Sequence, residues 1–183
     1  TLPYFIPLPP QVSFLGTLGA VIRMRLRTGE RRVLYDIGIA GPLAGFVVAV
    51  PVTLIGLGMS HVSGAPSATS GVMLGESILF RLLERLVLGP LGASDVVMLH
   101  PVALAGWTGL FVTGLNLIPI GMLDGGHVSY GLLGRRSIWL AIAAMAGLAG
   151  LAAFVFPGWF FWLGLLFLLG VRHPAARLPS API

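Results

Sequence analysis

The sequence predicts an all-α polytopic membrane protein, with about four transmembrane helices and a small membrane-associated β-hairpin near the N-terminus. Of its 183 residues, 56% are hydrophobic and only 9% are charged, and the mean hydropathy is +0.96. A soluble domain usually carries about 25% charged residues. Long charge-free runs supply the helices, and an alternating stretch ahead of the first run supplies the hairpin.

Residues 1–36 are expected to form an extended segment followed by the hairpin. Proline recurs too often in residues 1–12 for a regular helix. Over residues 21–27, arginines alternate with apolar residues, which is a strand pattern, and residues 28–30 read as a turn. The alternative is a basic juxtamembrane loop held by acidic lipid headgroups.

Four segments are expected to cross the membrane: residues 37–59, 96–119, 137–156 and, as a short span, 159–171. The first is free of charge and long enough to cross a hydrocarbon core of about 30 Å with some tilt. It contains Gly41 and Gly45, whose spacing of four residues makes a groove for close packing of another helix. These segments therefore predict a tightly packed bundle.

A short amphipathic helix is expected over residues 79–88, between the first two spans. In this interpretation Arg81, Glu84 and Arg85 face water. Glu84 lies three residues after Arg81, a spacing at which a pair contributes a few tenths of a kcal/mol.

The arginines predict the orientation, since all 11 basic residues are arginine. Arg81 and Arg85 fall on one side of the four-span arrangement. The side that holds the larger number of arginines is expected to be cytoplasmic. It carries Arg23, Arg25, Arg27, Arg31, Arg32, Arg135, Arg136, Arg172 and Arg177. Because these arginines cluster beside apolar runs, they indicate a multi-pass protein in a lipid bilayer and not a nucleic-acid-binding protein.

One carboxylate lies just beyond the second span. Between Asp95 and Arg135, Asp124 is the only Asp, Glu, Lys or Arg. A charged group at membrane depth costs roughly 2.5–3.5 kcal/mol and marks a functional site by default. Helix-interrupting residues such as Pro119 and Gly121 surround it, and irregular backbone survives there only where protein or water satisfies it. From the residues alone, Asp124 is a metal ligand, a proton carrier, a substrate counter-ion or a helix cap.

The histidines do not complete a metal site with Asp124. A tight zinc site usually has three protein ligands, the chain has no cysteine, and none of its four histidines occurs as His-Glu-x-x-His. Only His127, three residues further on, is spaced to share a helix face with Asp124. We therefore interpret His127 as a polar residue at the membrane interface.

The stretch Asn116–Gly126 resembles a family signature, Asn-x-x-Pro-x-x-x-Leu-Asp-Gly-Gly. This signature is typical of the site-2 protease family of intramembrane zinc metalloproteases, peptidase family M50. The resemblance covers roughly residues 2–136, in the expected order. The other segments that look like the family are residues 3–7, 16–20, 36–45 and 100–107.

The resemblance implies an enzyme that cuts single-span membrane proteins. Asp124 would be the carboxylate ligand of a Zn²⁺ ion, which acidifies a water molecule for attack on a peptide carbonyl. Asn116 would donate to the substrate backbone or to the developing oxyanion. A strand containing Gly16, Thr17 and Gly19 would hold an unwound substrate by strand addition.

The family's His-Glu-x-x-His motif supplies the other two zinc ligands and the general base, and this sequence lacks it. Since the chain opens on the segment that follows this motif in the family, we expect a truncated sequence with both ligands upstream of Thr1. Residues 1–183 alone are then expected to be inactive. The alternatives are a transporter or channel subunit that uses Asp124 as an ion or proton site, and a non-catalytic homologue.

Overall fold

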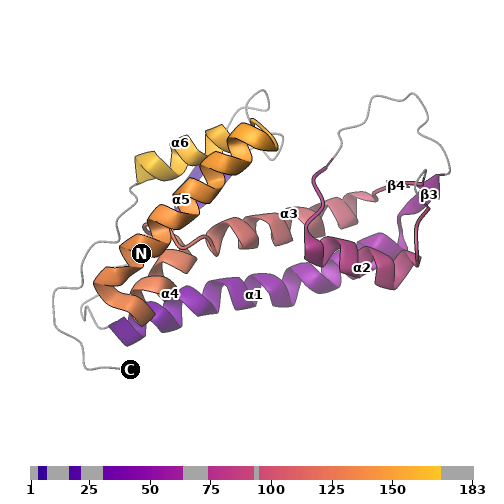
Figure 1. The fold of residues 1–183 in the computed structure, drawn as a ribbon. Coiled ribbons are helices and arrows are strands. Elements are labelled where there is room, and N and C mark those ends of the chain that lie inside the picture. The colour runs from indigo at the N-terminus through magenta and orange to yellow at the C-terminus, as the bar shows by residue number, and fades with distance from the viewer. Residues whose placement is uncertain (1–3, 8–16, 22–30, 64–73, 93–94, 170–183) are drawn as a thin grey trace.

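The computed structural model describes residues 4–7, 17–21, 31–63, 74–92 and 95–169. These residues are mainly helical, with short strands, as the sequence predicts (Figure 1). In chain order the elements are β1 (Tyr4–Pro7), β2 (Thr17–Val21), α1 (Arg31–Gly58), β3 (His61–Ser63), α2 (Ile78–Leu88), β4 (Val96–Met98), α3 (Pro101–Asn116), α4 (Asp124–Leu133), the 3-10 turn η1 (Gly134–Arg136), α5 (Ser137–Phe154) and α6 (Trp159–Leu169).

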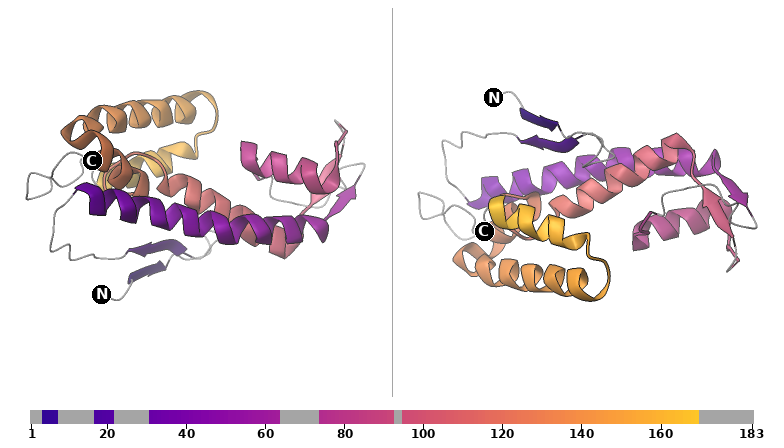
Figure 2. Two further views of the ribbon diagram at one scale, coloured as in Figure 1. Left: turned by 90° about the horizontal axis from the view of Figure 1, so that it is seen from below. Right: turned by 90° about the horizontal axis from the view of Figure 1, so that it is seen from above.

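The N-terminal β-element consists of β1 and β2, which pair in antiparallel fashion with Tyr4 opposite Val21. The expected strand over residues 21–27 and its turn lie outside the described residues, apart from Val21. The strand partner is the segment we expected to be merely extended. Pro7 at the end of β1 fits a short two-stranded ribbon, because proline is tolerated on edge strands. Both views of Figure 2 place this pair on the side of α1 opposite to α5 and α6.

Helices α1 and α3 form the centre of the fold and run antiparallel along a seam of small residues. Across it, Gly45 faces Thr113, Ala49 faces Gly109, Thr53 faces Gly106 and Gly56 faces Ala103. A Cβ at Gly56 would collide with the Ala103 backbone nitrogen, so the two backbones touch there. Small residues permit this approach between helices in a membrane. The prediction of a packing groove holds for Gly45, which faces Thr113 of α3, whereas Gly41 lies against the Asp124 side chain.

Two helix boundaries differ from the expected spans. Helix α1 begins at Arg31 and not at residue 37. The expected start was placed where the charge-free run begins, but a helix can continue beyond the hydrocarbon core into a charged segment. The expected span over residues 96–119 is divided. Residues 96–98 form β4, which pairs with β3, and α3 starts only at Pro101. The side chain of His100 caps α3 by accepting from the Val102 N–H at 3.2 Å.

Helix α2 agrees with the expected amphipathic helix in position and in the exposure of Arg81 and Arg85, but not in that of Glu84. Glu84 is buried, with 7% of its surface exposed, and so it does not face water. It lies on the same face as Phe80 and Leu83, which packs against α1 and α3. Arg81 therefore pairs with Glu76, at 2.7 Å, and not with Glu84.

Two helices among the described residues are long and apolar enough to cross a membrane: α1, and the continuous stretch Asp124–Phe154 that contains α4 and α5. Helix α3 has 16 residues and α6 has 11, so they rise about 24 Å and about 16 Å. Large apolar side chains stay exposed on α1 and α5, including Val47 at 72% and Phe154 at 90%. Such surfaces fit lipid better than water.

Helices α5 and α6 pack together beside the end of α3. Their cluster contains Ala141 and Leu148 of α5, Leu166 of α6, and Ile120 from the turn that follows α3. The rings of Phe111 in α3 and Trp162 in α6 form a T-shaped contact, with their centroids 5.9 Å apart. These contacts fix the turn that leads to Asp124.

Candidate metal centre

The candidate centre lies where the chain reverses between α3 and α4. Helix α3 ends at Asn116, and α4 begins with Asp124 in its first turn. In the turn, Gly121 has a φ of 55°, which favours glycine. A Cβ at Gly125 would collide with the Leu117 carbonyl oxygen, and one at Gly126 with the Gly121 carbonyl oxygen. The two glycines after Asp124 are thus what lets the turn fold back against α4.

The Asp124 side chain lies directly on α1. A Cβ at Gly41 would stand 2.8 Å from the Asp124 Oδ2 atom, so the carboxylate occupies the space that this glycine leaves empty. One turn earlier, a Cβ at Gly38 would stand 2.8 Å from the Asp124 carbonyl oxygen and 2.9 Å from the His127 Cβ. Gly38 and Gly41 therefore form the surface of α1 on which the start of α4 rests.

The other end of α4 is also fastened to α1. The Arg31 Nη2 atom donates to the carbonyl oxygens of Gly131 and Leu132, at 2.8 Å each. Gly131 packs against the Tyr35 side chain, whose Cβ would lie 2.7 Å from a Cβ at Gly131. Because cations favour the C-terminal carbonyls of a helix, Arg31 both caps α4 and holds it on α1. From the sequence, Arg31 was assigned only to membrane orientation, because its contact with α4 spans 100 residues of chain.

Asn116 reaches the same level of α1 as Asp124. The seam pairs Thr113 with Gly45, and the next turn of α3 brings Asn116 level with Gly41, against which Asp124 lies. Both side chains are partly exposed. Within the described residues, neither the Asn116 amide nor the Asp124 carboxylate makes a hydrogen bond or ion pair. Both groups are therefore available to a ligand.

Of the three histidines that the structure describes, only His127 lies near Asp124. His127 is buried, at 7% exposure, against Gly38, and so it is not the interface residue we expected. His61 lies in β3, and the His100 N–H donates to the Ser60 hydroxyl beyond the C-terminal end of α1. In the part of the chain that the structure describes, no three His, Cys, Asp or Glu side chains come together as a metal site.

The predicted substrate strand is only partly described. Gly16 lies outside the described residues, whereas Thr17 and Gly19 lie in β2, paired to β1.

Helix α4 packs mainly on α1 and α5.

Comparison with protein families gives a match to "Peptidase family M50" over residues 3–158. The chain belongs to peptidase family M50. The match begins just before β1, includes Asn116 and Asp124, and ends between α5 and α6. The family that the motif resembles is thereby confirmed.

Curated relatives agree with membership of family M50. The chain is 33% identical over 179 residues to "Probable zinc metalloprotease EGY2, chloroplastic" of Arabidopsis thaliana, covering 97% of this chain and 31% of that protein. It is 32% identical over 184 residues to "Probable zinc metalloprotease EGY1, chloroplastic" of the same plant, covering 95% of this chain and 32% of that protein. This M50 chain thus spans about a third of the length of these relatives. No solved structure matches it.

The names of the M50 relatives imply zinc, and the described residues fit it in part. Asp124 offers a partly buried carboxylate that pairs with no other described residue, and a carboxylate is an ordinary zinc ligand. It is one ligand where three are usual. The described residues supply no cluster that would complete the set.

Proposed function

We propose that this chain is part of the catalytic core of a site-2-type intramembrane zinc metalloprotease, in which Asp124 is the carboxylate ligand of the zinc ion. The observation that carries the proposal is the Asp124 carboxylate, which has no partner among the described residues and lies against Gly41 at a helix break in an M50 chain. The remaining ligands would come from other parts of the full-length protein. Bound zinc would supply an acidified water for hydrolysis.

The residues of this chain would position the metal and the substrate. Gly41 leaves room for the carboxylate, and Gly38 and Arg31 hold α4 against α1. Asn116, level with Asp124 along α1, would donate its side-chain amide to the substrate backbone or to the developing oxyanion. The strand β2, with Gly16 just before it, would bind an unwound segment of a single-span membrane protein by strand addition.

The proposed topology is multi-pass, with the arginine-rich side cytoplasmic. Helix α1 and the stretch that contains α5 are long and apolar enough to span and would be the long spans, and α3 and α6 would complete the four-span arrangement. The Arg31 end of α1 and the Arg135–Arg136 pair between α4 and α5 would both lie at the cytoplasmic side. Asp124 would then lie toward that side, where cleavage releases a cytoplasmic fragment.

The variant Asp124→Asn in the full-length protein tests this function. We expect it to lose cleavage of a single-span reporter and to lose bound zinc, while membrane insertion is unchanged. The matched control is Asp95→Asn, whose carboxylate accepts from the Gly92 N–H in the exposed connection between α2 and β4. An Asp124→Asn protein with normal zinc content and normal cleavage would remove Asp124 from the metal.

A further inference from the structure

The connection between α1 and α3 begins and ends at the same end of this helix pair. Strands β3 and β4 pair in antiparallel fashion, with His61 opposite Met98 and Ser63 opposite Val96. They close the base of this connection at the end of α1 that is remote from Asp124 (Figure 1). Helix α2 lies inside the connection. In Figures 1 and 2 it runs alongside the C-terminal part of α1.

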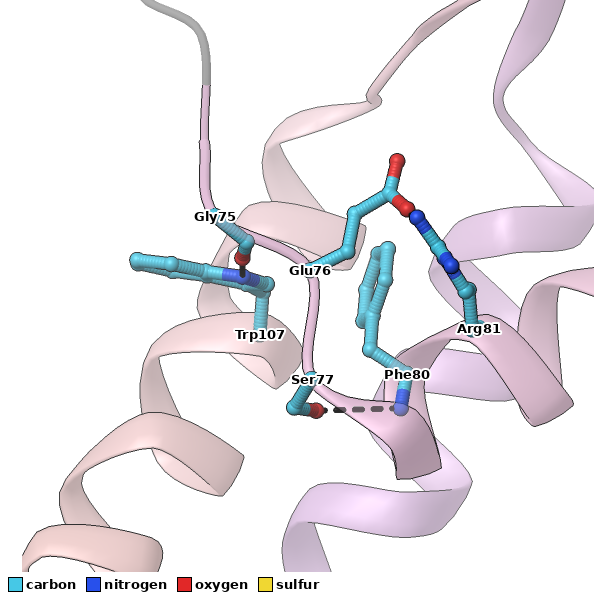
Figure 3. A network of polar contacts seen from close by, with 6 residues as sticks. All are labelled: Gly75, Glu76, Ser77, Phe80, Arg81 and Trp107. Carbon is cyan, nitrogen blue, oxygen red and sulfur yellow. Dashed lines mark hydrogen bonds and ion pairs between the residues drawn. The ribbon is translucent and has the colours of Figure 1, made fainter. Parts of the chain in front are cut away.

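Helix α2 is firmly attached to the two central helices. Phe80 and Leu83 are buried against Ala49 and Leu57 of α1 and against Leu110 of α3. The chain entering α2 is held as well, because the Trp107 Nε1–H donates to the Gly75 carbonyl oxygen at 2.9 Å (Figure 3). The Ser77 hydroxyl caps the helix by accepting from the Phe80 N–H at 3.1 Å. The backbone of this entry is therefore satisfied within the protein.

The outer surface of α2 carries two different stripes. Ile78, Leu82 and Leu86, spaced by four residues, are 83%, 59% and 75% exposed and form an apolar stripe. The neighbouring stripe carries Arg81 and Arg85, and Arg81 is paired with Glu76 just before the helix. A helix that faces water on its whole outer surface does not normally expose an unbroken row of large aliphatic side chains.

We propose that α2 is a re-entrant helix, which enters the lipid leaflet farther from Asp124 and returns to the same side. Its apolar stripe faces acyl chains, and its charged stripe faces a water-accessible space. Three observations support this. Helix α2 lies alongside α1, which is apolar enough to span the bilayer, and strands β3 and β4 bring both ends of the connection to the same side. The 11 residues of α2 rise about 16 Å, which is half of a hydrocarbon core of about 30 Å.

The charges on α2 fit the same arrangement. Ionisable side chains at membrane depth face the protein interior or a water-filled cavity and not lipid. Glu84 is buried on the face that packs against α1 and α3, whereas Arg81 and Arg85 lie on the stripe that we assign to water, where Arg81 pairs with Glu76. The proposal rests on α1 crossing the bilayer, and it is independent of the zinc site.

Spin labels test the proposal directly, because the 183 residues contain no native cysteine. The variants Ile78→Cys, Leu82→Cys, Leu86→Cys, Arg81→Cys and Arg85→Cys are made in the full-length protein, with any cysteines outside these residues replaced. Each is labelled and reconstituted in phospholipid vesicles. Collision with oxygen reports lipid, and collision with a nickel chelate reports water. Val47→Cys on α1 and Asp95→Cys in the exposed connection are the lipid and water references.

We expect labels on the apolar stripe to behave like the Val47→Cys label, with depth increasing from position 86 to 78 by about 6 Å for each four-residue step. Labels at positions 81 and 85 should collide with nickel. Nickel access at all five positions, equal depth along the apolar stripe, or low access to both reagents at that stripe would each overturn the proposal. Nickel access at Val47→Cys would instead show that α1 does not span, and the proposal would fall with that premise.

Discussion

The variant Gly41→Ala should displace the Asp124 carboxylate without unfolding the protein. The added Cβ would stand 2.8 Å from Oδ2, whereas ordinary contacts begin at 3.4 Å, so this oxygen must move by about 0.6 Å (3.4 − 2.8). The atom that moves is the end of a side chain. Alanine also favours a helix over glycine by about 1 kcal/mol, so α1 should not be weakened. A ligand shift of this size exceeds the roughly 0.5 Å tolerance of functional sites.

We therefore expect the zinc affinity and the cleavage rate of Gly41→Ala to fall about 10- to 100-fold, since misplacement by about 1 Å costs about 100-fold. Zinc affinity is measured by competition with a chelator, and thermal unfolding in detergent checks the fold. The matched control is Gly114→Ala on α3, where an added Cβ meets nothing within 4 Å. Unchanged zinc affinity in Gly41→Ala, with the fold intact, would refute the placement of the carboxylate against Gly41.

Two further changes test how α4 is held. Arg31→Gln removes the charged donor of two hydrogen bonds to the last turn of α4. It should lower the free energy of unfolding by about 1.5–3 kcal/mol. The control is Arg32→Gln at the exposed neighbour, and equal stability of the two variants would contradict this role of Arg31. Gly125→Ala forces a Cβ into the backbone of the turn and should prevent accumulation of folded protein, whereas Gly147→Ala on α5 has open space and should be tolerated. Normal expression and melting of Gly125→Ala would show that the turn is not packed as described.

The residues around Asp124 could be recognised from sequence because they act locally. A lone carboxylate between Asp95 and Arg135, with proline and glycine around it, marks both a helix break and a functional site. The start of α4 at Asp124 agrees with that expectation. The contact between the Asp124 side chain and Gly41 was missed, because a glycine in a helix gives the same sequence signal whether it packs against a backbone or against a carboxylate.

The features that were predicted wrongly from sequence depend on contacts between distant segments. The apolar residues before Pro101 read as part of a span, yet they form β4 because β3 is available to pair with them. Glu84 was assigned to water because a pattern with two faces was assumed for α2. That helix has three faces, namely one buried, one apolar and exposed, and one charged. Only the packing of α2 on α1 and α3 distinguishes them.

The most direct test of Asp124 as a zinc ligand is X-ray absorption at the zinc edge of the full-length Asp124→Cys variant. The 183 residues contain no cysteine, and any cysteines outside them would be replaced beforehand. We predict one sulfur scatterer at about 2.3 Å from the zinc, the usual Zn–S distance, and none in the parent protein or in Asp95→Cys. Zinc bound in Asp124→Cys with only oxygen and nitrogen neighbours would contradict the assignment of Asp124 to the metal.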